Sequence, residues 1–465
     1  MRLSALTVAL LVAGGIGCDS SRNPVSPGPT STGNGDNGND AGGTMPADMG
    51  AGGSAGMGGG GGGGGGGGMP DMATGPGPWP VADITTYGSA QGLGGGILDA
   101  NPDEAQNIWA TNGETLYVLR PGTSTFQAFT ATDGLHIGGF TDPYGNASET
   151  RITAIAGGAA GQVYVGYYGY ESDDPYHDTL AQKQLGNGDD VKIDGSGKIA
   201  SITRLLFQCD AERQNGCWEN RSPRRIIYTH LGVAAGHSWW GFNHGVTHVL
   251  GDDFGDHVHP EVWYTPSMPG NQGEEKLGEF YGIAPDAAGN LWMAGKYGVG
   301  CQSWNPIPHG PPGTDPAGDQ WVSGRQIWAF TTDTSDHSLG DPQGPYVTRG
   351  YVENNRGAAV TPDGKLWLAR LGGGLVSWDP ATHNYNTIQR YGQVPSDLMD
   401  AQADPDGTLW LVTSGGALLR FDPGSGTAQT WPGVAGVTRI YVDTMVTPRA
   451  VYVSMSGGLA VIRAK

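Results

Sequence analysis

The stretch Thr361-Pro-Asp-Gly-Lys-Leu-Trp-Leu-Ala-Arg-Leu-Gly-Gly-Gly-Leu-Val-Ser-Trp-Asp-Pro380 returns 43 residues later as Asp404-Pro-Asp-Gly-Thr-Leu-Trp-Leu-Val-Thr-Ser-Gly-Gly-Ala-Leu-Leu-Arg-Phe-Asp-Pro423. Pro-Asp-Gly is typical of a tight turn, and the apolar alternation around Leu-Trp is typical of a strand. The glycine pair predicts the next turn, and Asp-Pro ends the third strand. Each copy therefore predicts a small antiparallel meander, and its recurrence indicates a repeat architecture.

The same skeleton recurs along the chain with an aromatic residue on its second predicted strand. These residues are Trp109, Tyr164, Trp239, Trp292, Trp367, Trp410 and Tyr452. The units predict an all-β fold, a seven-bladed β-propeller of four-stranded antiparallel blades. An eight-bladed ring or an open array is the alternative. An aromatic residue needed at one place in every unit is expected to fill the core between blades, rather than to stack on sugars or bases.

The last unit stops one strand short of four. Its strands are predicted around Val437–Val442, Ala450–Ser454 and Leu459–Arg463. Just before the first unit, Val81–Tyr87 reads like the missing strand, since Ile84-Thr-Thr-Tyr-Gly is similar to Thr387-Ile-Gln-Arg-Tyr-Gly. We expect this N-terminal segment to complete the last blade as its outer strand, which leaves no open edge in the ring.

Residues 1–17 have the order of a signal peptide: a basic residue, an apolar run and a small residue before Cys18. A cysteine at this place resembles the bacterial lipobox, which implies that Cys18 is lipidated and becomes the first mature residue. Gly15 departs from the leucine usual three places before that cysteine, and Asp19 resembles an inner-membrane retention signal. An ordinary secretory signal is the alternative, and both readings export the chain.

Residues 18–78 are dominated by small and turn-forming residues and include an unbroken glycine run, Gly58–Gly68. Such a composition cannot bury a core, so we expect a disordered tether between the lipidated cysteine and a propeller at 79–465. The net charge is −20 with no basic run, which disfavours nucleic acid as a partner.

Cys209 and Cys217 are eight residues apart, a spacing that in an exported chain predicts a disulfide closing a short loop. Cys301 is left over and is expected to be a small buried apolar residue. No CxxC pair suggests zinc. We expect no cofactor.

Five of the 11 histidines fall between His237 and His259, beside several acidic residues. In a four-stranded meander, turns 1–2 and 3–4 lie on one face and turn 2–3 lies on the other. This parity splits the histidines between faces, so we expect no shared metal site. The acidic loop Glu171–Asp178 lacks the spacing of an EF-hand and is expected to be a solvated insertion. No G-x-S-x-G, H-E-x-x-H or phosphate-binding loop occurs in the propeller.

The repeats resemble those of two-component regulator propellers, the periplasmic input domains of hybrid sensor kinases. The matching residues are Gly92-Leu93, Gly134-Leu135, Asp363-Gly-Lys-Leu-Trp, Asp406-Gly-Thr-Leu-Trp, Gly373-Gly-Leu and Gly457-Gly-Leu. This resemblance implies a propeller that binds a ligand outside the cytoplasm. The chain shows no following transmembrane helix or kinase, so we expect it to depend on another protein for signalling. The repeat is also similar to that of virginiamycin B lyase, which implies the alternative of an enzyme with a metal and a histidine on the channel face.

We therefore expect a monomeric binding module in the cell envelope, anchored by lipid to the inner or outer membrane, with a saccharide, peptide or protein ligand and no catalysis of its own. Four long insertions share one face by turn parity: Thr130–Glu149, Glu171–Gly188, Gln208–Arg224 and Thr331–Arg356. Structural drift is the alternative reason for them. We predict a ligand site at that mouth of the channel. Its expected contacts are Tyr170, His177, His244, Tyr297 and Arg370.

Overall fold

The computed structural model describes the propeller region in a series of segments. They are residues 82–141, 145–169, 186–205, 222–229, 237–242, 246–250, 257–258, 280–286, 290–295, 298–303, 327–331, 354–379 and 389–464. All of them belong to one compact unit, Met72–Lys465. Apart from two 3-10 turns, Ser89–Gln91 and Ala131–Asp133, every regular element in them is a strand, which confirms the all-β prediction. In these segments no helix is long and apolar enough to cross a membrane.

The strands pair into seven small antiparallel sheets. Each sheet is given from its innermost strand outward. The first contains β2 (Asp99–Pro102), β3 (Ile108–Thr111), β4 (Leu116–Leu119) and β5 (Gln127–Phe129). The second contains β7 (Ala147–Gly157), β8 (Gln162–Tyr168), β9 (Gly188–Ile193) and β10 (Ile199–Leu205), and the third contains β11 (Pro223–Thr229), β12 (His237–Phe242), β13 (Val246–Leu250) and β14 (His257–Val258). The fourth sheet contains β15 (Phe280–Pro285), β16 (Asn290–Gly295), β17 (Gly298–Ser303) and β18 (Ile327–Thr331). The fifth contains β19 (Asn355–Val360), β20 (Leu366–Arg370), β21 (Gly374–Trp378) and β22 (Gln389–Tyr391). The sixth contains β23 (Leu398–Ala403), β24 (Leu409–Thr413), β25 (Leu418–Asp422) and β26 (Thr427–Thr430). The last sheet contains β27 (Val437–Asp443), β28 (Ala450–Met455), β29 (Gly458–Ala464) and β1 (Ala82–Tyr87).

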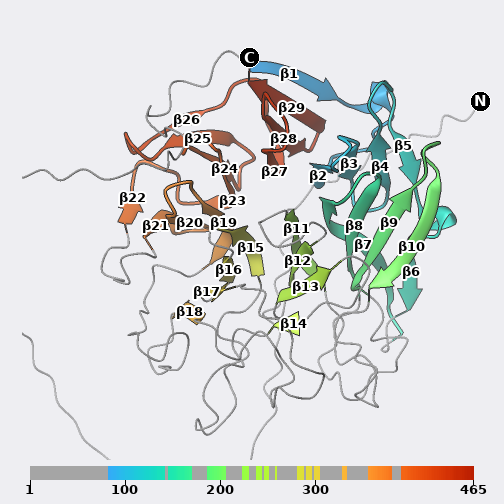
Figure 1. The fold of residues 1–465 in the computed structure, drawn as a ribbon, viewed down its shortest axis with the longest axis horizontal. Helices are drawn as coiled ribbons and strands as arrows, with labels where there is room; N and C mark the ends of the chain where they lie inside the picture. Colours follow the sequence, from blue (N-terminus) through green and yellow to red (C-terminus); the bar gives the residue numbers. More distant parts are fainter. Residues whose placement is uncertain are drawn as a thin grey trace, which may run out of the picture. The chain divides into compact units, whose positions relative to one another are not determined.

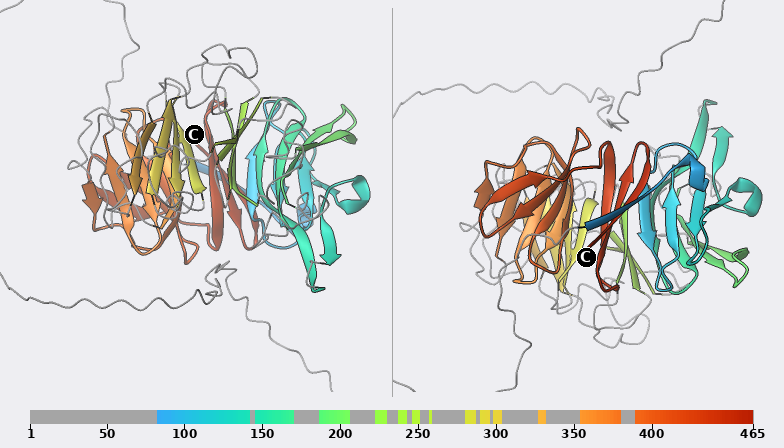
Figure 2. Two further views of the ribbon diagram at one scale, coloured as in Figure 1. Left: turned by 90° about the horizontal axis from the view of Figure 1, so that it is seen from below. Right: turned by 90° about the horizontal axis from the view of Figure 1, so that it is seen from above.

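The sheets have a propeller-like arrangement, with their innermost strands around a common centre (Figure 1). Each innermost strand contacts that of the next sheet in chain order, and β27 contacts β2. Seen from the side, neighbouring sheets stand next to one another (Figure 2). The start of every innermost strand therefore lies toward one mouth of a central channel, and the end of every innermost strand lies toward the other.

The segment before the first sheet completes the last one, as the sequence predicted. β1 pairs antiparallel with β29 from Ala82 opposite Ala464 to Tyr87 opposite Leu459. In Figure 1 this blue strand runs along the red β29. The last sheet thus contains three strands from the chain's C-terminal part and one from before the first sheet.

One sheet departs from the predicted four strands. Its fifth strand, β6 (Gly138–Thr141), pairs with the first residues of β7, from Gly138 opposite Thr150 to Thr141 opposite Ala147. The segment Thr130–Glu149, predicted as a loop, is wrong in this respect because it contains a short hairpin. The alternation of small and polar residues there gave no apolar signal for a strand.

The recurring aromatic residues lie on the second strand of each sheet and are at most 2% exposed. Trp410 packs against Ile440 and Val451 of the next sheet, and Tyr452 packs against Ala100 of the first. Their predicted role as core between sheets is confirmed.

In three sheets, a side chain of the turn before the second strand accepts a hydrogen bond from the buried tryptophan of that strand. The indole nitrogens of Trp109 and Trp410 donate to the carboxylates of Asp103 at 3.0 Å and Asp404 at 2.9 Å, each six residues earlier. Trp367 donates to the hydroxyl of Thr361 in the same way, at 2.9 Å. The turn side chain therefore satisfies the one polar atom of a buried tryptophan.

Candidate functional site

The innermost strands share an irregularity close to their first residues. In six of them the register with the second strand shifts at one residue, as in a β-bulge. The side chain at that residue is partly or fully exposed, whereas the residue before it is buried. Together with the corresponding residue before β2, these positions form what we call the bulge ring: Leu98, Thr153, Arg224, Tyr281, Arg356, Met399 and Thr438.

The two threonines of the bulge ring make equivalent hydrogen bonds. The Thr153 hydroxyl donates to the carbonyl of Pro223 at 2.6 Å, and the Thr438 hydroxyl donates to the carbonyl of Ile97 at 2.7 Å. In both cases the acceptor is the residue just before the bulge position of the next sheet. The second bond links the last sheet to the first.

One residue further along, charged side chains meet in the channel. The layer contains Asp99, Ala154, Arg225, Gly282, Gly357, Asp400 and Arg439. Arg225 Nη1 lies 3.0 Å from Asp400 Oδ2, and both side chains are nearly inaccessible to solvent. Because Arg225 is on β11 and Asp400 is on β23, with β15 and β19 between them on one side, the Arg225 side chain crosses the channel.

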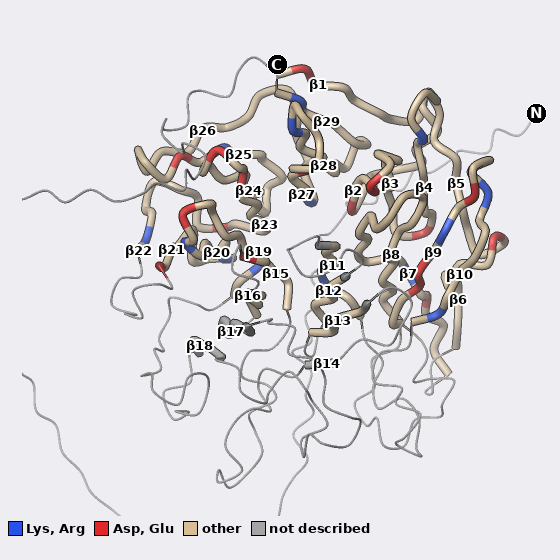
Figure 3. Tube along the Cα trace, in the orientation of Figure 1, with Lys and Arg blue, Asp and Glu red and all other residues tan. Residues whose placement is uncertain are grey.

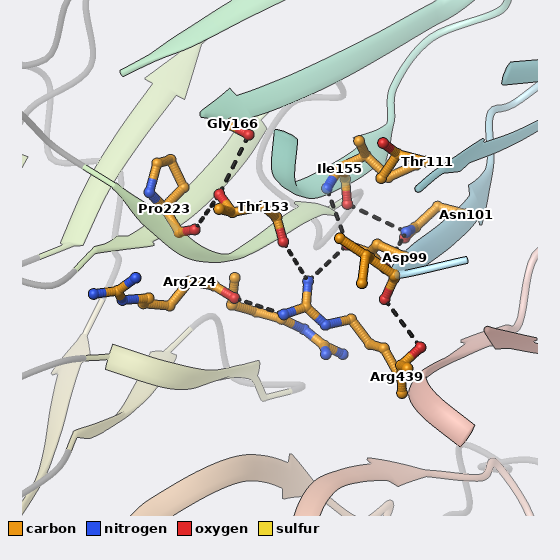
Figure 4. Close-up of polar contacts among 12 residues, drawn as sticks. Asp99, Asn101, Thr111, Thr153, Ile155, Gly166, Pro223, Arg224 and Arg439 are labelled. Atoms are coloured by element: carbon orange, nitrogen blue, oxygen red, sulfur yellow. Dashed lines mark hydrogen bonds and ion pairs between the residues drawn. The ribbon is translucent and has the colours of Figure 1, made fainter. Parts of the chain in front are cut away.

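Arg439 joins three other innermost strands (Figure 4). Its Nη1 lies 2.8 Å from Asp99 Oδ2, and its Nη2 donates to the Arg224 carbonyl at 2.9 Å. Asp99 in turn accepts the backbone N–H of Ile155 at 2.9 Å. In Figure 3 the acidic part of β2 and the basic part of β27 lie close to the centre of the ring. We call Asp99, Arg225, Asp400 and Arg439 the crossing network.

The formal charges of the crossing network balance, and the Arg225 guanidinium stays protonated. Burial lowers the pKa of Arg225, but the charges of Asp400 and Asp99 and the hydrogen bond to Asp400 outweigh that effect and raise it above its ordinary value. Two guanidinium groups and two carboxylates balance one another. The network therefore supplies rigidity at the centre and leaves no net charge there for a ligand.

Beyond the crossing network, a cavity of about 600 Å³ lies among the later residues of the innermost strands. Its walls come from β11, β15, β19, β23 and β27 and from the turn after β27. The lining residues are Ile227, Tyr228, Ile283, Ala284, Pro285, Ala358, Ala359, Val360, Gln402, Ala403, Tyr441, Thr444 and Met445. The walls are mostly apolar, with a few amide and hydroxyl groups among them.

Beside this cavity, the Tyr441 hydroxyl stays protonated. Burial, followed by the charge of Asp443, raises its pKa above the ordinary value. Asp443 is buried and accepts from Gln106 Nε2 at 3.1 Å and from the Met445 N–H at 2.9 Å. Tyr441 can therefore donate a hydrogen bond but does not act as a base near neutral pH.

Of the predicted ligand contacts, the structure describes Arg370. It ends β20 opposite Asn355, at the mouth where the bulge ring lies, and is 5% exposed. Its Nη1 donates to the Gly373 carbonyl at 3.4 Å, within the turn after β20. The other predicted residues lie outside the described segments: Tyr170, His177, His244, Tyr297, Cys18, Cys209 and Cys217. Cys301 lies in β17.

In the described segments, no group of three or more His, Cys, Asp or Glu residues could hold a metal ion. The seven innermost strands contain no histidine. The described histidine with a buried acidic partner, His136, lies away from them, with its Nδ1 2.7 Å from Asp189 Oδ2. The Tyr167 hydroxyl donates to the same Asp189 oxygen at 2.6 Å.

Comparison with known proteins finds no matching family model and no matching curated protein. Several solved structures share the propeller arrangement at low identity. "YCF48 bound to D1 peptide" is 14% identical with a TM-score of 0.46 and matches over 83% of this chain and 97% of its own. The extracellular domain of a putative hybrid two-component system from B. thetaiotaomicron is 16% identical with a TM-score of 0.45, over 81% of this chain and 40% of its own. A streptogramin B lyase is 10% identical with a TM-score of 0.46, over 83% and 98%. At this level these proteins have a similar fold and say nothing further about this chain.

Proposed function

We propose that this protein is a binding module of the cell envelope, tethered by lipid on Cys18, that takes part of a peptide ligand into the cavity of its channel. The observation that supports this is the cavity of about 600 Å³ between rigid innermost strands. Binding pockets for small ligands typically measure about 300 to 1,000 Å³ and are mostly apolar with a few polar groups. The crossing network gives the cavity a fixed inner end.

The chemistry of the walls favours a peptide segment over a free saccharide. Ile283, Ala358 and Ala359 offer apolar surface, whereas Gln402 and Tyr441 offer an amide and a hydroxyl. Burying an apolar side chain against such walls contributes roughly 1.5 to 3 kcal/mol. A sugar would leave many of its hydroxyl groups without partners there.

The test is a thermal-shift screen of the purified propeller against peptide and glycan panels. We expect a rise in the melting temperature with peptides that have a large apolar residue. Gln402→Trp, which fills the cavity, should abolish that rise, whereas the matched variant Gln389→Trp, on the outermost strand β22, should retain it. Stabilisation by glycans alone, or an unchanged response of Gln402→Trp, would contradict the proposed peptide site.

The lipid anchor has a separate test. Cys18→Ser should move the protein from the membrane fraction to the soluble fraction, because the thioether to lipid cannot form. The same fractionation of Asp19→Ser is the control, since that variant keeps the cysteine. An unchanged membrane-bound pool in Cys18→Ser would show that something else holds the protein.

We further propose that the seven sheets are the blades of one closed propeller. We also propose that Cys209 and Cys217 form a disulfide that closes a short loop. The segment 206–221, which contains both cysteines, joins β10 to β11. Peptide mapping of exported protein without reductant should find the two cysteines in one linked peptide. Two free thiols would refute the disulfide.

At the mouth where the bulge ring lies, opposite the cavity, we propose that the insertions rim a separate contact region for a ligand. Tyr170, His177, His244, Tyr297 and Arg370 are its proposed contacts. Turn parity supports this placement, since Arg370 lies at that mouth.

A further inference from the structure

Three consecutive positions of the bulge ring form a cation–aromatic–cation cluster. The Arg356 guanidinium carbon lies 4.1 Å from the centre of the Tyr281 ring, and that of Arg224 lies 6.0 Å from it. These are the second residues of β11, β15 and β19, which are neighbours in the ring. Both cations are thus held against one aromatic side chain at one mouth of the channel.

The remaining ring positions add no negative charge. Leu98, Thr153, Met399 and Thr438 are neutral, and the acids of the next layer, Asp99 and Asp400, are paired with Arg439 and Arg225. The Arg356 Nε atom is buried and has no hydrogen-bond partner. The bulge ring therefore contains two positive charges, and one guanidinium retains an unused donor.

Two members of the bulge ring are apolar and exposed. Leu98 is 39% exposed and Met399 is 37% exposed, and they are two of the four large hydrophobic side chains exposed among the described residues. Met399 is the second residue of β23, next to the strand of Arg356. A ligand held by the arginines can thus rest an apolar group on Met399.

We propose that this mouth binds a carboxylate attached to an apolar group, the chemistry of a peptide C-terminus with an apolar last residue. The planar guanidinium group matches a carboxylate with two parallel hydrogen bonds. The Tyr281 ring holds the Arg356 plane in place before the ligand arrives, which reduces the entropy lost on binding. This inference rests on the proposed binding function but concerns the mouth opposite the cavity.

The experiment uses isothermal titration of the intact exported protein with acetyl-Ala-Ala-Leu bearing a free carboxylate. The same peptide as its C-terminal amide is the neutral control, and we expect it to bind at least tenfold more weakly. Arg356→Gln should weaken binding of the free acid about tenfold and leave the weak binding of the amide unchanged. Arg390→Gln, an equal loss of charge on the exposed outer strand β22, should leave both affinities unchanged.

Arg356→Lys distinguishes the contribution of the positive charge from that of the planar guanidinium group. Its melting temperature shows whether a substitution at this position disturbs folding. The variant keeps the positive charge but not the two-pronged group, so we expect an intermediate affinity with an unchanged melting temperature. Equal affinity for acid and amide, or normal binding by Arg356→Gln, would overturn the inference. So would glucuronate binding more tightly than the peptide, since its carboxylate lies beside hydroxyl groups.

The variants distinguish failure of the cavity proposal from failure of the carboxylate inference. If peptide binding is lost in Gln402→Trp but unaffected in Arg356→Gln, the cavity is the binding site and the carboxylate inference is wrong. If Arg356→Gln loses binding and Gln402→Trp does not, the bulge ring is the site and the cavity proposal is wrong.

Discussion

At the scale of single residues, buried carboxylates hold the first turn of the repeats. Asp103 is inaccessible to solvent and accepts from Trp109 Nε1 at 3.0 Å, from Asn107 Nδ2 at 2.7 Å and from the Gly161 N–H of the next sheet at 2.9 Å. Burial raises the pKa of Asp103, although these hydrogen bonds lower it in part. One turn side chain therefore ties a tryptophan, its own loop and a neighbouring sheet together.

This pKa predicts the sign of a pH effect. The folded protein holds the Asp103 proton more tightly than the unfolded chain does, so protonation of Asp103 stabilises the fold. This contribution to the free energy of unfolding is complete below the ordinary pKa of 3.8 and is lost as pH rises through the pKa of Asp103 in the folded protein. The difference in free energy of unfolding between wild type and Asp103→Asn should therefore shrink over that range and then stay constant. Urea titrations from pH 3 upward measure it.

Asp363 serves as a control of opposite sign. Burial raises its pKa, but hydrogen bonds from Thr361 and Lys365 and the charge of Lys365 outweigh this, so the pKa is lowered. The difference between wild type and Asp363→Asn should grow as pH rises through the folded pKa. A parallel trend for the two variants would contradict both assignments.

At the scale of elements, glycines allow the innermost strands to approach one another. A Cβ atom at Gly357 would lie 2.5 Å from the Ala401 backbone nitrogen and 2.9 Å from the Asp400 carbonyl carbon, and one at Gly282 would lie 2.5 Å from the Ala358 nitrogen. Backbone atoms cannot move aside as a side-chain end can. These contacts set the spacing of β15, β19 and β23 around the channel.

Gly357→Ala should therefore destabilise the protein by about 1 to 3 kcal/mol, the usual cost of overpacking. Gly392→Ala is the matched control, because a Cβ there meets nothing within 4 Å. Chemical denaturation compares the two. Equal stability of the two variants would show that β19 and β23 separate at no cost.

The sequence repeats predicted the strands well, but they did not predict the residues of the bulge ring and the crossing network, and the reason is physical. Tyr164 and Trp410 fill the same space in their sheets, so packing imposes a recurring residue type that a sequence comparison detects. The bulge ring and the layer beneath it face the channel, where no repeated packing partner exists, so their residues differ from sheet to sheet. A usable signal was present in Arg224-Arg225, because charges inside an otherwise apolar first strand need a partner.

The strand β1 is expected to stabilise the whole ring. Replacing Ala82–Tyr87 by a Gly-Ser segment of equal length removes its pairing with β29 and exposes a sheet edge, so both the melting temperature and the solubility should fall. The same replacement of six residues within Gly58–Gly68 is the control and should change neither. Unaltered melting of the β1 variant would mean that this strand contributes no stability.

At the scale of the whole molecule, the crossing network connects parts of the chain that the sheets keep apart. Arg225 and Asp400 are 175 residues apart, and Arg439 and Asp99 are 340 apart. Each pair joins innermost strands from different sheets. The network therefore acts against relative movement of the sheets, since a displacement of one would separate buried charges.

Breaking the buried pair should be costly. Arg225→Met leaves Asp400 buried without its counterion, and we expect a loss of about 3 to 5 kcal/mol in the free energy of unfolding. The double variant with Asp400→Asn should recover part of that loss, because the uncompensated charge is gone. A double-mutant cycle with additive effects would show that the two groups do not interact.

The pairing of β1 with β29 also determines when the last sheet can be completed. A ribosome makes β1 long before β29, so the first strand of the ring has no partner until almost the entire repeat region has been synthesised. A product that ends early would keep both an unpaired first strand and an incomplete last sheet, which are features that proteases cleave readily. A chain that ends before β29 is therefore expected to be degraded more readily than a complete chain.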